Sequence, residues 1–249
     1  MYQSQREEQI LQLLSASKYM SVKELSACLA VSESSIRRSL TSLEQKGILT
    51  RSYGGAELIE TGSHVTPFSV RARHNSPAKK AMARKAAALV RDNDVVFLDQ
   101  SSSALYVAQE LLQKRGVTVI TNNLEILLLL ADSDLAVWSS GGALFRKNRT
   151  CLLGEDACAA FEQTRADIVF FSTKALTADG TILDYAREEV CIRRCMLRNA
   201  ARRVFLCDSE KVGGTASYKQ GTLADVDCLI CEEDLTDRFQ AAFPQLTIL

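Results

Sequence analysis

The chain has 249 residues, 47% of them hydrophobic, and its formal net charge is zero. This length suits one large domain or a small domain followed by a medium one, and the apolar content excludes an intrinsically disordered chain. The neutral charge excludes a polyelectrolyte that binds nucleic acid over its whole surface, so a nucleic-acid interface requires a local concentration of positive charge.

The N-terminal segment MYQSQREEQILQLL is polar and then amphipathic, without the continuous apolar stretch of a secretory signal. The longest apolar run, residues 126–131, is too short to cross a bilayer. We therefore expect a cytoplasmic protein with no membrane partner.

Eight cysteines and two histidines are the residues to consider for a metal site. Without an export signal, reduced thiols are expected. Cys228 and Cys231 form a C-x-x-C in a predicted strand, where residues three apart point to opposite faces, and Cys191 and Cys195 could share a helix face. Because no second pair at ligand spacing exists, we expect core or surface thiols, no metal and no cofactor.

The first elements in chain order are helices. Apolar spacing predicts a helix over residues 5–14. A second begins at Ser21, which forms with Glu24 the S-x-x-E spacing of a capping box. After a short turn, Ser32 is placed to cap a third helix that ends at Gly47. Two helices joined by a tight turn predict a helix-turn-helix.

The third helix has an apolar side with Ile36, Leu40 and Leu43. Its opposite side carries Arg37, Arg38 and small hydrogen-bonding residues. This side suits a helix in the DNA major groove, where arginine pairs with guanine or contacts phosphates. For an arginine pair taken alone, an ordinary solvated helix face is the alternative.

The following stretch ILTRSYGGAELI predicts a strand, a Gly54-Gly55 turn and a second strand. Such a hairpin is a wing, and its presence favours DNA binding over a solvated face. The predicted DNA interface is Ser32, Ser34, Ser35, Arg37, Arg38, Thr41, Arg51, Tyr53 and Gly54.

This region resembles the N-terminal domain of the DeoR family of bacterial transcription regulators. The matching positions are Val31-Ser32, Ile36-Arg37-Arg38, Leu43-Glu44, Gly47, Arg51 and Gly54-Gly55-Ala56. Ser35 stands where the family usually has threonine, and Ser39 where it usually has aspartate, which removes a negative charge near the arginines. The resemblance implies DNA binding, with room for a different operator preference.

Residues 61–68 are rich in turn formers. We predict a DNA-binding domain over residues 1–60, a linker over residues 61–75 and an effector-sensing domain over residues 76–249. From residue 69 to residue 91 the chain has seven Lys and Arg residues and no acidic one. We interpret this run as a solvated face of an interdomain helix; contact with DNA phosphates or an anionic ligand is the alternative.

Beyond residue 91, apolar strands alternate with helical stretches such as residues 104–114 and 189–199. The strands are VVFLD, VTVIT, LAVWSS, DIVFFS, VFLCD and CLICEE. The alternation predicts an α/β domain with a mostly parallel, Rossmann-like sheet and helices on both faces.

In such sheets ligands bind outside the carboxyl ends of the strands. Polar segments follow the predicted strands at residues 99–103, 121–123, 141–142, 173–174 and 208–211. Each is ordinary by itself, but in a parallel sheet all would line one edge. The serine run also opens a helix, whose free N–H groups attract anions. Together they favour a small polyhydroxy compound with a phosphate.

This part resembles the C-terminal sensor domain of the DeoR family, which resembles ribose-5-phosphate isomerase in fold. The matching positions are Lys79, Asp99, Thr121-Asn122, Gly141-Gly142, Gly154, Glu189, Arg193, Met196, Asp208 and Lys211. The resemblance covers about residues 6–232 and implies a phosphorylated sugar effector. The predicted effector site is Lys79, Asp99, Ser101, Ser102, Ser103, Thr121, Asn122, Gly141, Gly142, Lys174, Arg193, Asp208 and Lys211.

Two departures concern this site. The family's Asp-x-Gly-Thr-Thr loop is DQSSS here, and serine adopts positive φ angles less freely than glycine. Arg193 stands where lysine is usual, which keeps the charge but presents a planar fork. An unusual effector and a site that has lost its ligand both stay open.

We predict a repressor of a carbohydrate-metabolism operon that binds DNA as a homo-oligomer, a dimer or tetramer, because paired half-sites require paired recognition helices. The alternative is a sugar-phosphate isomerase-like enzyme with Asp99 or Asp184 as base. The sequence has no phosphate-binding loop or catalytic triad, and a winged helix is hard to explain in a metabolic enzyme, so we expect a protein that is not an enzyme.

Overall fold

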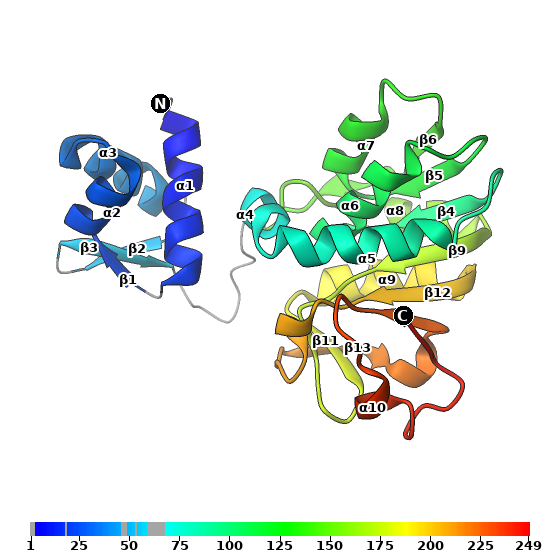
Figure 1. Ribbon diagram of the computed structural model, residues 1–249. Coiled ribbons are helices and arrows are strands. Elements are labelled where there is room, and N and C mark those ends of the chain that lie inside the picture. The colour runs from blue at the N-terminus through cyan, green and yellow to red at the C-terminus, as the bar shows by residue number, and fades with distance from the viewer. Residues whose placement is uncertain (1–2, 18, 46–48, 53, 59–67) are drawn as a thin grey trace. The chain divides into compact units, whose positions relative to one another are not determined.

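The computed structural model describes residues 3–17, 19–45, 49–52, 54–58 and 68–249. The chain divides into two compact units, Met1–His74 and Asn75–Leu249, and Figure 1 labels their helices and strands. Within the described ranges, no helix has both the length and the apolar character needed to cross a membrane.

The N-terminal unit is a winged helix-turn-helix, as predicted. Its helices are α1 (Gln3–Ala16), α2 (Val22–Leu29) and α3 (Glu33–Gln45). Its antiparallel sheet has the order β1-β3-β2, with β1 (Tyr19–Ser21), β2 (Leu49–Ser52) and β3 (Gly55–Leu58). The apolar sides of the three helices meet in one core that includes Ile10, Leu25, Ile36 and Leu40. The wing strands β2 and β3 were predicted, and β1 was not.

The helix-turn-helix is held by local capping. The Ser21 hydroxyl accepts a hydrogen bond from the Glu24 N–H at 3.2 Å, and the Glu24 carboxylate accepts one from the Ser21 N–H at 2.7 Å. This confirms the predicted capping box. Between α2 and α3, Ala30 adopts a left-handed conformation with φ 51° and ψ 42°. The carbonyl of Ser32 then accepts the first bonds of α3, from the N–H groups of Ser35 and Ile36.

Part of the segment predicted as a linker is helical. Residues 68–73 form α4 (Phe68–Arg73), and Val70 packs into the core of the N-terminal unit. This unit therefore extends to His74, beyond residue 60. The predicted domain boundary was based on turn-forming residues. Such residues do not reveal that Val70, further along the chain, packs on the core of the N-terminal unit.

The C-terminal unit is built on a seven-stranded sheet in which all neighbouring strands are parallel. Its order is β15-β14-β12-β9-β4-β5-β6. The strands are β4 (Val95–Leu98), β5 (Thr118–Thr121), β6 (Ala136–Ser139), β9 (Ala166–Phe171), β12 (Ala200–Leu206), β14 (Cys228–Ile230) and β15 (Thr247–Ile248). Six of them were predicted, and the short β15 was missed.

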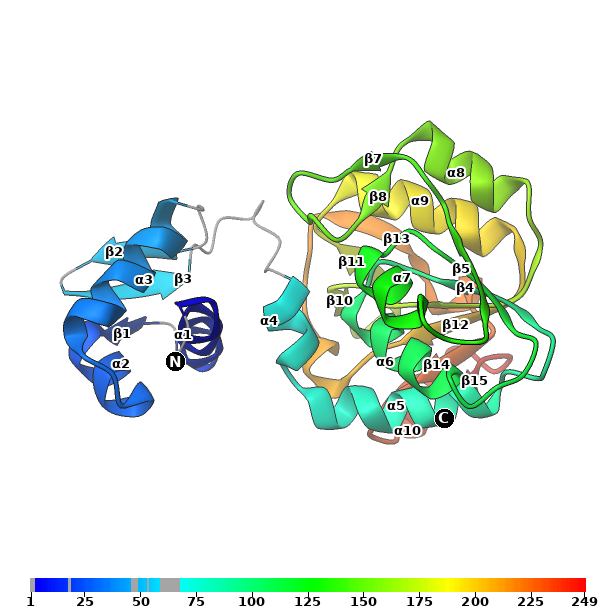
Figure 2. The same ribbon diagram turned by 90° about the horizontal axis from the view of Figure 1, so that it is seen from above.

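Helices cover both faces of this sheet, as Figure 2 shows. On one face lie α5 (Ser76–Ala88), α6 (Ser102–Leu111) and α7 (Leu124–Leu130), and on the other lie α8 (Glu155–Glu162) and α9 (Arg187–Arg198). Successive side chains of each strand point alternately to the two faces of the sheet. In β4, Val96 and Leu98 pack on the first face and Phe97 on the second.

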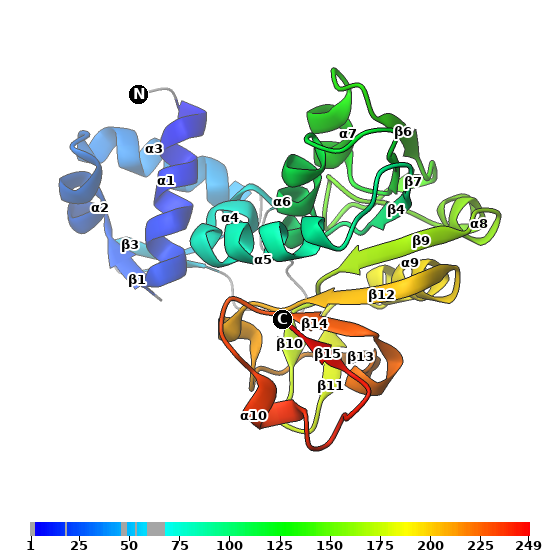
Figure 3. The same cartoon turned by 45° about the vertical axis from the view of Figure 1, so that its right-hand side comes forward.

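A smaller antiparallel sheet lies beyond β12 and β14 (Figure 3). It has the order β10-β11-β13 and consists of β10 (Ala175–Leu176), β11 (Thr181–Asp184) and β13 (Tyr218–Thr222). A third apolar cluster joins it to α10 (Thr236–Phe239) and the main sheet. Short 3₁₀ turns occupy η1 (Ser209–Lys211) and η2 (Leu223–Asp225), and β7 (Ala143–Leu144) pairs with β8 (Leu152–Leu153).

The eight cysteines are free thiols. As predicted, Cys228 and Cys231 lie on opposite faces of the sheet, in different apolar clusters. Burial raises the pKa of Cys195 and of Cys231 to about 12, so both thiols are protonated at neutral pH. In the part of the chain that the structure describes, no group of His, Cys, Asp or Glu is arranged to hold a metal ion.

The strand order places a topological switch point between β4 and β9. From β4 the chain continues to β5 and β6 on one side, and from β9 it continues to β12, β14 and β15 on the other. The connections leave the carboxyl ends of β4 and β9 in opposite directions, which opens a crevice between them. The residues that follow β4 and β9 are therefore the first place to look for a ligand site.

Candidate DNA interface and candidate effector site

The outward side of α3 carries two exposed arginines. The Arg37 guanidinium contacts the Glu33 carboxylate one turn earlier at 3.1 Å, and both side chains are about half exposed, at 52% and 49%. Arg38 is exposed and makes no hydrogen bond or ion pair with any other residue in the described ranges. Arg38 is thus free to bind an external partner. Arg37 can do so only if it also keeps, or breaks, its weak surface ion pair with Glu33.

The wing is tied to the same side of α3. Arg51 on β2 donates to the Thr41 hydroxyl at 3.0 Å, and its backbone N–H donates to Glu44 at 3.3 Å. Gly54 has φ 79° in the turn of the wing, and its carbonyl accepts a bond from the first residue of α2. Hydrogen bonds therefore link the wing, which carries Arg51 and Gly54, to the helix-turn-helix, which carries Thr41. Tyr53 lies outside the described residues.

Three serines form a small hydroxyl cluster at the start of α3. The Ser32 hydroxyl lies 3.1 Å from that of Ser34 and 3.0 Å from that of Ser35. Ser32 and Ser34 are exposed. Hydroxyls and N–H groups at the N-terminus of a recognition helix are the groups that contact phosphates and base edges in helix-turn-helix proteins.

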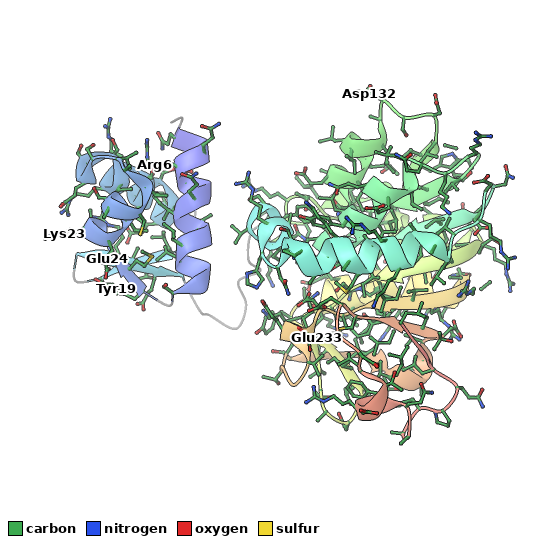
Figure 4. The ribbon with its side chains drawn as sticks, viewed as in Figure 1. Arg6, Tyr19, Lys23, Glu24, Asp132 and Glu233 are labelled. Atoms are coloured by element: carbon green, nitrogen blue, oxygen red, sulfur yellow. The ribbon has the colours of Figure 1, made fainter. Side chains whose placement is uncertain are left out.

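Ser39 faces the interior and not the arginines. It is fully buried, and its hydroxyl accepts a hydrogen bond from Nε of Arg6 on α1 at 2.9 Å. Figure 4 labels Arg6 and shows it on the side of α1 that meets α3. The interpretation of Ser39 as a lost charge beside Arg37 and Arg38 was wrong, because position 39 lies on the buried side of the helix. A serine here affects how α1 packs on α3.

At the switch point, Asp99 anchors the loop that follows β4. One carboxylate oxygen accepts from the Ser101 N–H at 3.0 Å, and the other accepts from the Ser172 N–H at 3.3 Å and from Nε of Arg193 at 3.0 Å. Asp99 is completely buried. The carboxylate therefore joins the ends of β4 and β9 to helix α9.

Arg193 is the centre of this network. Besides Asp99, its guanidinium contacts Asp184 at 3.1 Å, Glu189 at 4.0 Å and the Gln220 side-chain oxygen at 2.9 Å. Its side chain is 1% exposed. Burial acts to lower the pKa of Arg193, but Asp184, Asp99 and Glu189 outweigh it and raise the pKa, so the guanidinium stays ionised. Its charge is already neutralised by protein carboxylates.

Amide side chains extend the network towards β5. Gln100 donates to Glu189 at 3.2 Å and accepts from Asn122 at 3.3 Å, and Asn148 donates to Glu189 at 3.2 Å. All these residues are buried. Glu189 thus holds together the loop after β4 and the turn between β7 and β8.

A second charged group lies after β12. The Lys211 ammonium contacts the Asp208 carboxylate at 3.0 Å and donates to the Ser172 hydroxyl at 2.7 Å. Burial acts to raise the pKa of Asp208, but Lys211 and the buried Lys79 outweigh it and hold that pKa below its usual value. Lys79 of α5 therefore lies near the segment after β12 that carries Asp208 and Lys211.

The serine run closes this edge of the sheet. Ser101 is the N-cap of α6, and its hydroxyl accepts from the Ala104 N–H at 3.1 Å. Ser102 and Ser103 follow in the first turn, and both are buried. Four buried side-chain atoms of this unit have no hydrogen-bond partner among the described residues: Ser103 Oγ, Asn122 Oδ1, Asn123 Nδ2 and Gln220 Nε2. Buried polar atoms are normally paired, so these atoms are the candidate contacts for a ligand or water.

Other predicted effector residues lie outside the network. Lys174 is exposed, and its ammonium lies 5.6 Å from the centre of the Tyr185 ring. Gly141 and Gly142 are exposed and follow the edge strand β6. The Thr121 hydroxyl donates a hydrogen bond to the Leu98 carbonyl at 2.7 Å, which links β5 to β4.

Several central residues were not among the predicted effector-binding residues. They are Gln100, Asn148, Ser172, Asp184, Glu189 and Gln220. Glu189 had a local signal, because it lies four residues before Arg193 on a predicted helix and faces the same side. Gln220 and Asn148 had none, because their positions depend on the small sheet and on the β7–β8 turn.

The ionisation of Asp208 should contribute to stability at neutral pH. Its pKa is lower in the folded chain than in the unfolded one, so its contribution is fully present above the unfolded pKa and is lost as the pH falls through the folded pKa. We expect the stability difference between the wild type and Asp208→Asn to be constant near pH 7 and to narrow below about pH 4. Urea unfolding at a series of pH values measures this, and a difference that stays constant to pH 3 contradicts it.

Comparison with known proteins identifies both units. Residues 6–62 match the DeoR-like helix-turn-helix domain, and residues 74–233 match the DeoR C-terminal sensor domain. The regulator GolR of Listeria innocua is 32% identical over 98% of this chain and 96% of its own length. The glycerol-3-phosphate regulon repressor of Escherichia coli is 29% identical over 92% of this chain and 90% of its own.

Among solved structures, ribose 5-phosphate isomerase from Plasmodium falciparum is similar over 54% of this chain and 52% of its own, with 14% identity and a TM-score of 0.40. That score is too low to support an argument about fold or activity. The family matches cover both units of the chain, and the relatives match it over nearly its full length. The chain therefore belongs to the DeoR family and is a DNA-binding transcriptional regulator with a C-terminal sensor domain.

Proposed function

We propose that this regulator is a repressor whose operator affinity is controlled by a phosphorylated sugar or a related polyol phosphate. The observation that carries the proposal is the buried polar network at the switch point of the sensor domain, with Ser103, Asn122 and Gln220 left with unpaired atoms. A named relative, the glycerol-3-phosphate regulon repressor, supports the choice of a small phosphorylated polyol.

The charges of the network suggest which protein groups bind the phosphate of such a ligand and which bind its hydroxyl groups. Arg193 is surrounded by three carboxylates and has little attraction left for an anion. The phosphate is better served by the N-terminus of α6, where N–H groups of the serine run are not used inside the helix. The hydroxyl groups of the ligand suit the free amide atoms of Asn122 and Gln220.

In the N-terminal unit, we propose that α3 enters the major groove and that the wing contacts the adjacent backbone. Arg38 has no partner among the described residues, and Arg37 has only a half-exposed one, so both are available to DNA. Operators read by such helices consist of paired half-sites, so the protein acts as a homo-oligomer.

We propose that the sensor domain binds its ligand without turning it over. The two aspartates considered as an isomerase base are both held by other groups. Asp99 accepts from three donors, and Asp184 contacts Arg193 and accepts from the Tyr185 N–H at 2.7 Å. Both carboxylates are therefore bound by donors of the protein itself and are not presented to a ligand.

The experiment is to measure binding of the purified protein to its own upstream DNA by fluorescence anisotropy, at fixed salt, with a panel of sugar phosphates and polyol phosphates. We expect specific binding that one compound class weakens. Specific binding that is indifferent to the whole panel would contradict the proposed effector class and leave DNA binding in place. Turnover of any compound in the panel would contradict the non-enzymatic proposal.

Ser102→Ala tests the serine loop. We expect the effector concentration that releases DNA to rise at least about 10-fold, because one hydrogen bond to a charged group is worth about 1.5 kcal/mol or more. DNA affinity should be unchanged in the absence of effector. Ser217→Ala, an exposed serine of the same domain, is the control. An unchanged response of Ser102→Ala would exclude this hydroxyl from the effector site.

Lys211→Ala tests the other predicted contact in the same way. We expect a weakened effector response with DNA binding kept in its absence. Since Lys211 also contacts Asp208 and Ser172, circular dichroism must show that the variant is folded. Loss of DNA binding together with the effector response would indicate a folding defect and not a ligand contact.

A further inference from the structure

The edge strand β6 is surrounded by exposed apolar side chains. It is the last strand of the seven-stranded sheet. Trp138 on β6 is 58% exposed, Leu128 on α7 is 72% exposed and Leu144 on β7 is 50% exposed. Among the described residues, these are the large hydrophobic side chains with at least half of their surface exposed. Their concentration at one sheet edge is a feature of an interaction surface.

In the part of the chain that the structure describes, no strand pairs with the outer side of the β6 backbone. The N–H groups of Ala136 and Ser140 donate inward, to Val117 and to Thr121 of β5. Because neighbouring residues of a strand present their N–H and C=O groups to opposite sides, those of Val137 point away from the sheet. A second strand can therefore add to this edge without disturbing β5.

We propose that the strand which adds to this edge is β6 of a second copy of the chain. Two copies related by a twofold axis must pair identical strands in an antiparallel manner. An axis at Val137 lets the outward N–H and C=O groups of this residue bond reciprocally across the interface. In this register Trp138 stands opposite Ala136 of the second copy, a small and exposed residue on the same face of the sheet.

Charges at the two ends of β6 complement each other in this arrangement. The loop before β6 carries the exposed Asp132 and Asp134, and Figure 4 labels Asp132 at the end of this loop. Residues 140–154, which follow β6, include no acidic residue and three exposed basic ones: Arg146, Lys147 and Arg149. Antiparallel pairing brings the start of one β6 to the end of the other, so acidic and basic segments meet twice.

This pairing supplies the homo-oligomer on which the proposed binding to paired half-sites rests. The pairing of β6 requires neither DNA nor effector, and the mass of the full-length protein in solution tests it separately. Failure of the pairing would leave the effector proposal untouched, and failure of the effector proposal would leave the pairing untouched.

The test compares the wild type with Trp138→Glu by sedimentation velocity over a range of protein concentrations. The chain has a mass of 27.4 kDa. We expect the wild type to have twice this mass or more, and Trp138→Glu to have half the wild-type mass. The dissociation constant should rise at least about 100-fold, since each interface would bury two unpaired carboxylates. Tyr218→Glu, on β13 of the small sheet and 42% exposed in the wild type, should retain the wild-type mass.

Leu128→Glu provides a second substitution, on the outer side of α7, if Trp138→Glu does not fold by circular dichroism. The same loss of mass is expected. A wild-type protein that stays monomeric over the whole concentration range would overturn the inference. An oligomer that resists both substitutions would also overturn it, because the contact would then lie elsewhere on the chain.

Discussion

Replacing both Arg37 and Arg38 by alanine is expected to weaken specific operator binding by about 30-fold to 10⁴-fold, because each arginine contact to a base edge is worth about 1–3 kcal/mol. Both side chains lie on the exposed side of α3. Effector binding should be unchanged, since the effector site lies in the other compact unit. Fluorescence anisotropy with the operator and calorimetry with the effector measure the two quantities.

The single substitutions should differ. Arg37 already contacts Glu33 and must give up or share that ion pair on DNA, whereas Arg38 makes no such contact among the described residues. We therefore expect Arg38→Ala to account for the larger part of the loss. Arg165→Ala, an exposed arginine of the sensor domain, removes the same charge and is the control. If the double variant keeps its specific affinity at physiological salt, α3 is not the recognition helix.

Arg193→Met is expected to lower the free energy of unfolding by about 3–5 kcal/mol, the usual cost of leaving a buried charge without its partner. The substitution leaves Asp99, Asp184 and Glu189 facing one another in a buried site. For a domain of this size the melting temperature should fall by about 2–4 °C for each kcal/mol. Arg187→Met, an exposed arginine on the same helix, should have little effect.

The pH dependence distinguishes lost charge compensation from lost packing. Without Arg193, the three buried carboxylates lose the cation that they share and repel one another. The resulting loss of stability should be largest near neutral pH and should shrink in acid, because a carboxyl group that takes up a proton no longer repels its neighbours. Thermal unfolding between pH 7 and pH 5 measures this trend. A deficit independent of pH would mean that Arg193 acts through its packing alone.

The effector network illustrates what local patterns could and could not predict. The segments after β4, β5 and β12 were expected to be polar and to meet at one edge, and Asp99, Asn122 and Lys211 do lie there. The segment after β6 was expected beside them, but Gly141 and Gly142 are exposed next to the edge strand. Nothing in a sequence of alternating strands and helices says which strand stands at the edge and which at the switch point.

Local sequence patterns were sufficient to predict most of the main helices and strands and the family. Capping residues, apolar periodicity and the Gly54-Gly55 turn act over a few residues, so the helix-turn-helix, the wing strands and six strands of the main sheet followed from local patterns. Three features became visible only in the fold: Arg193 contacts three carboxylates, Ser39 bonds to Arg6, and β6 stands at the edge of the sheet. These features depend on contacts between segments far apart in the chain. Strand order and packing determine such contacts, and short-range propensities carry no information about them.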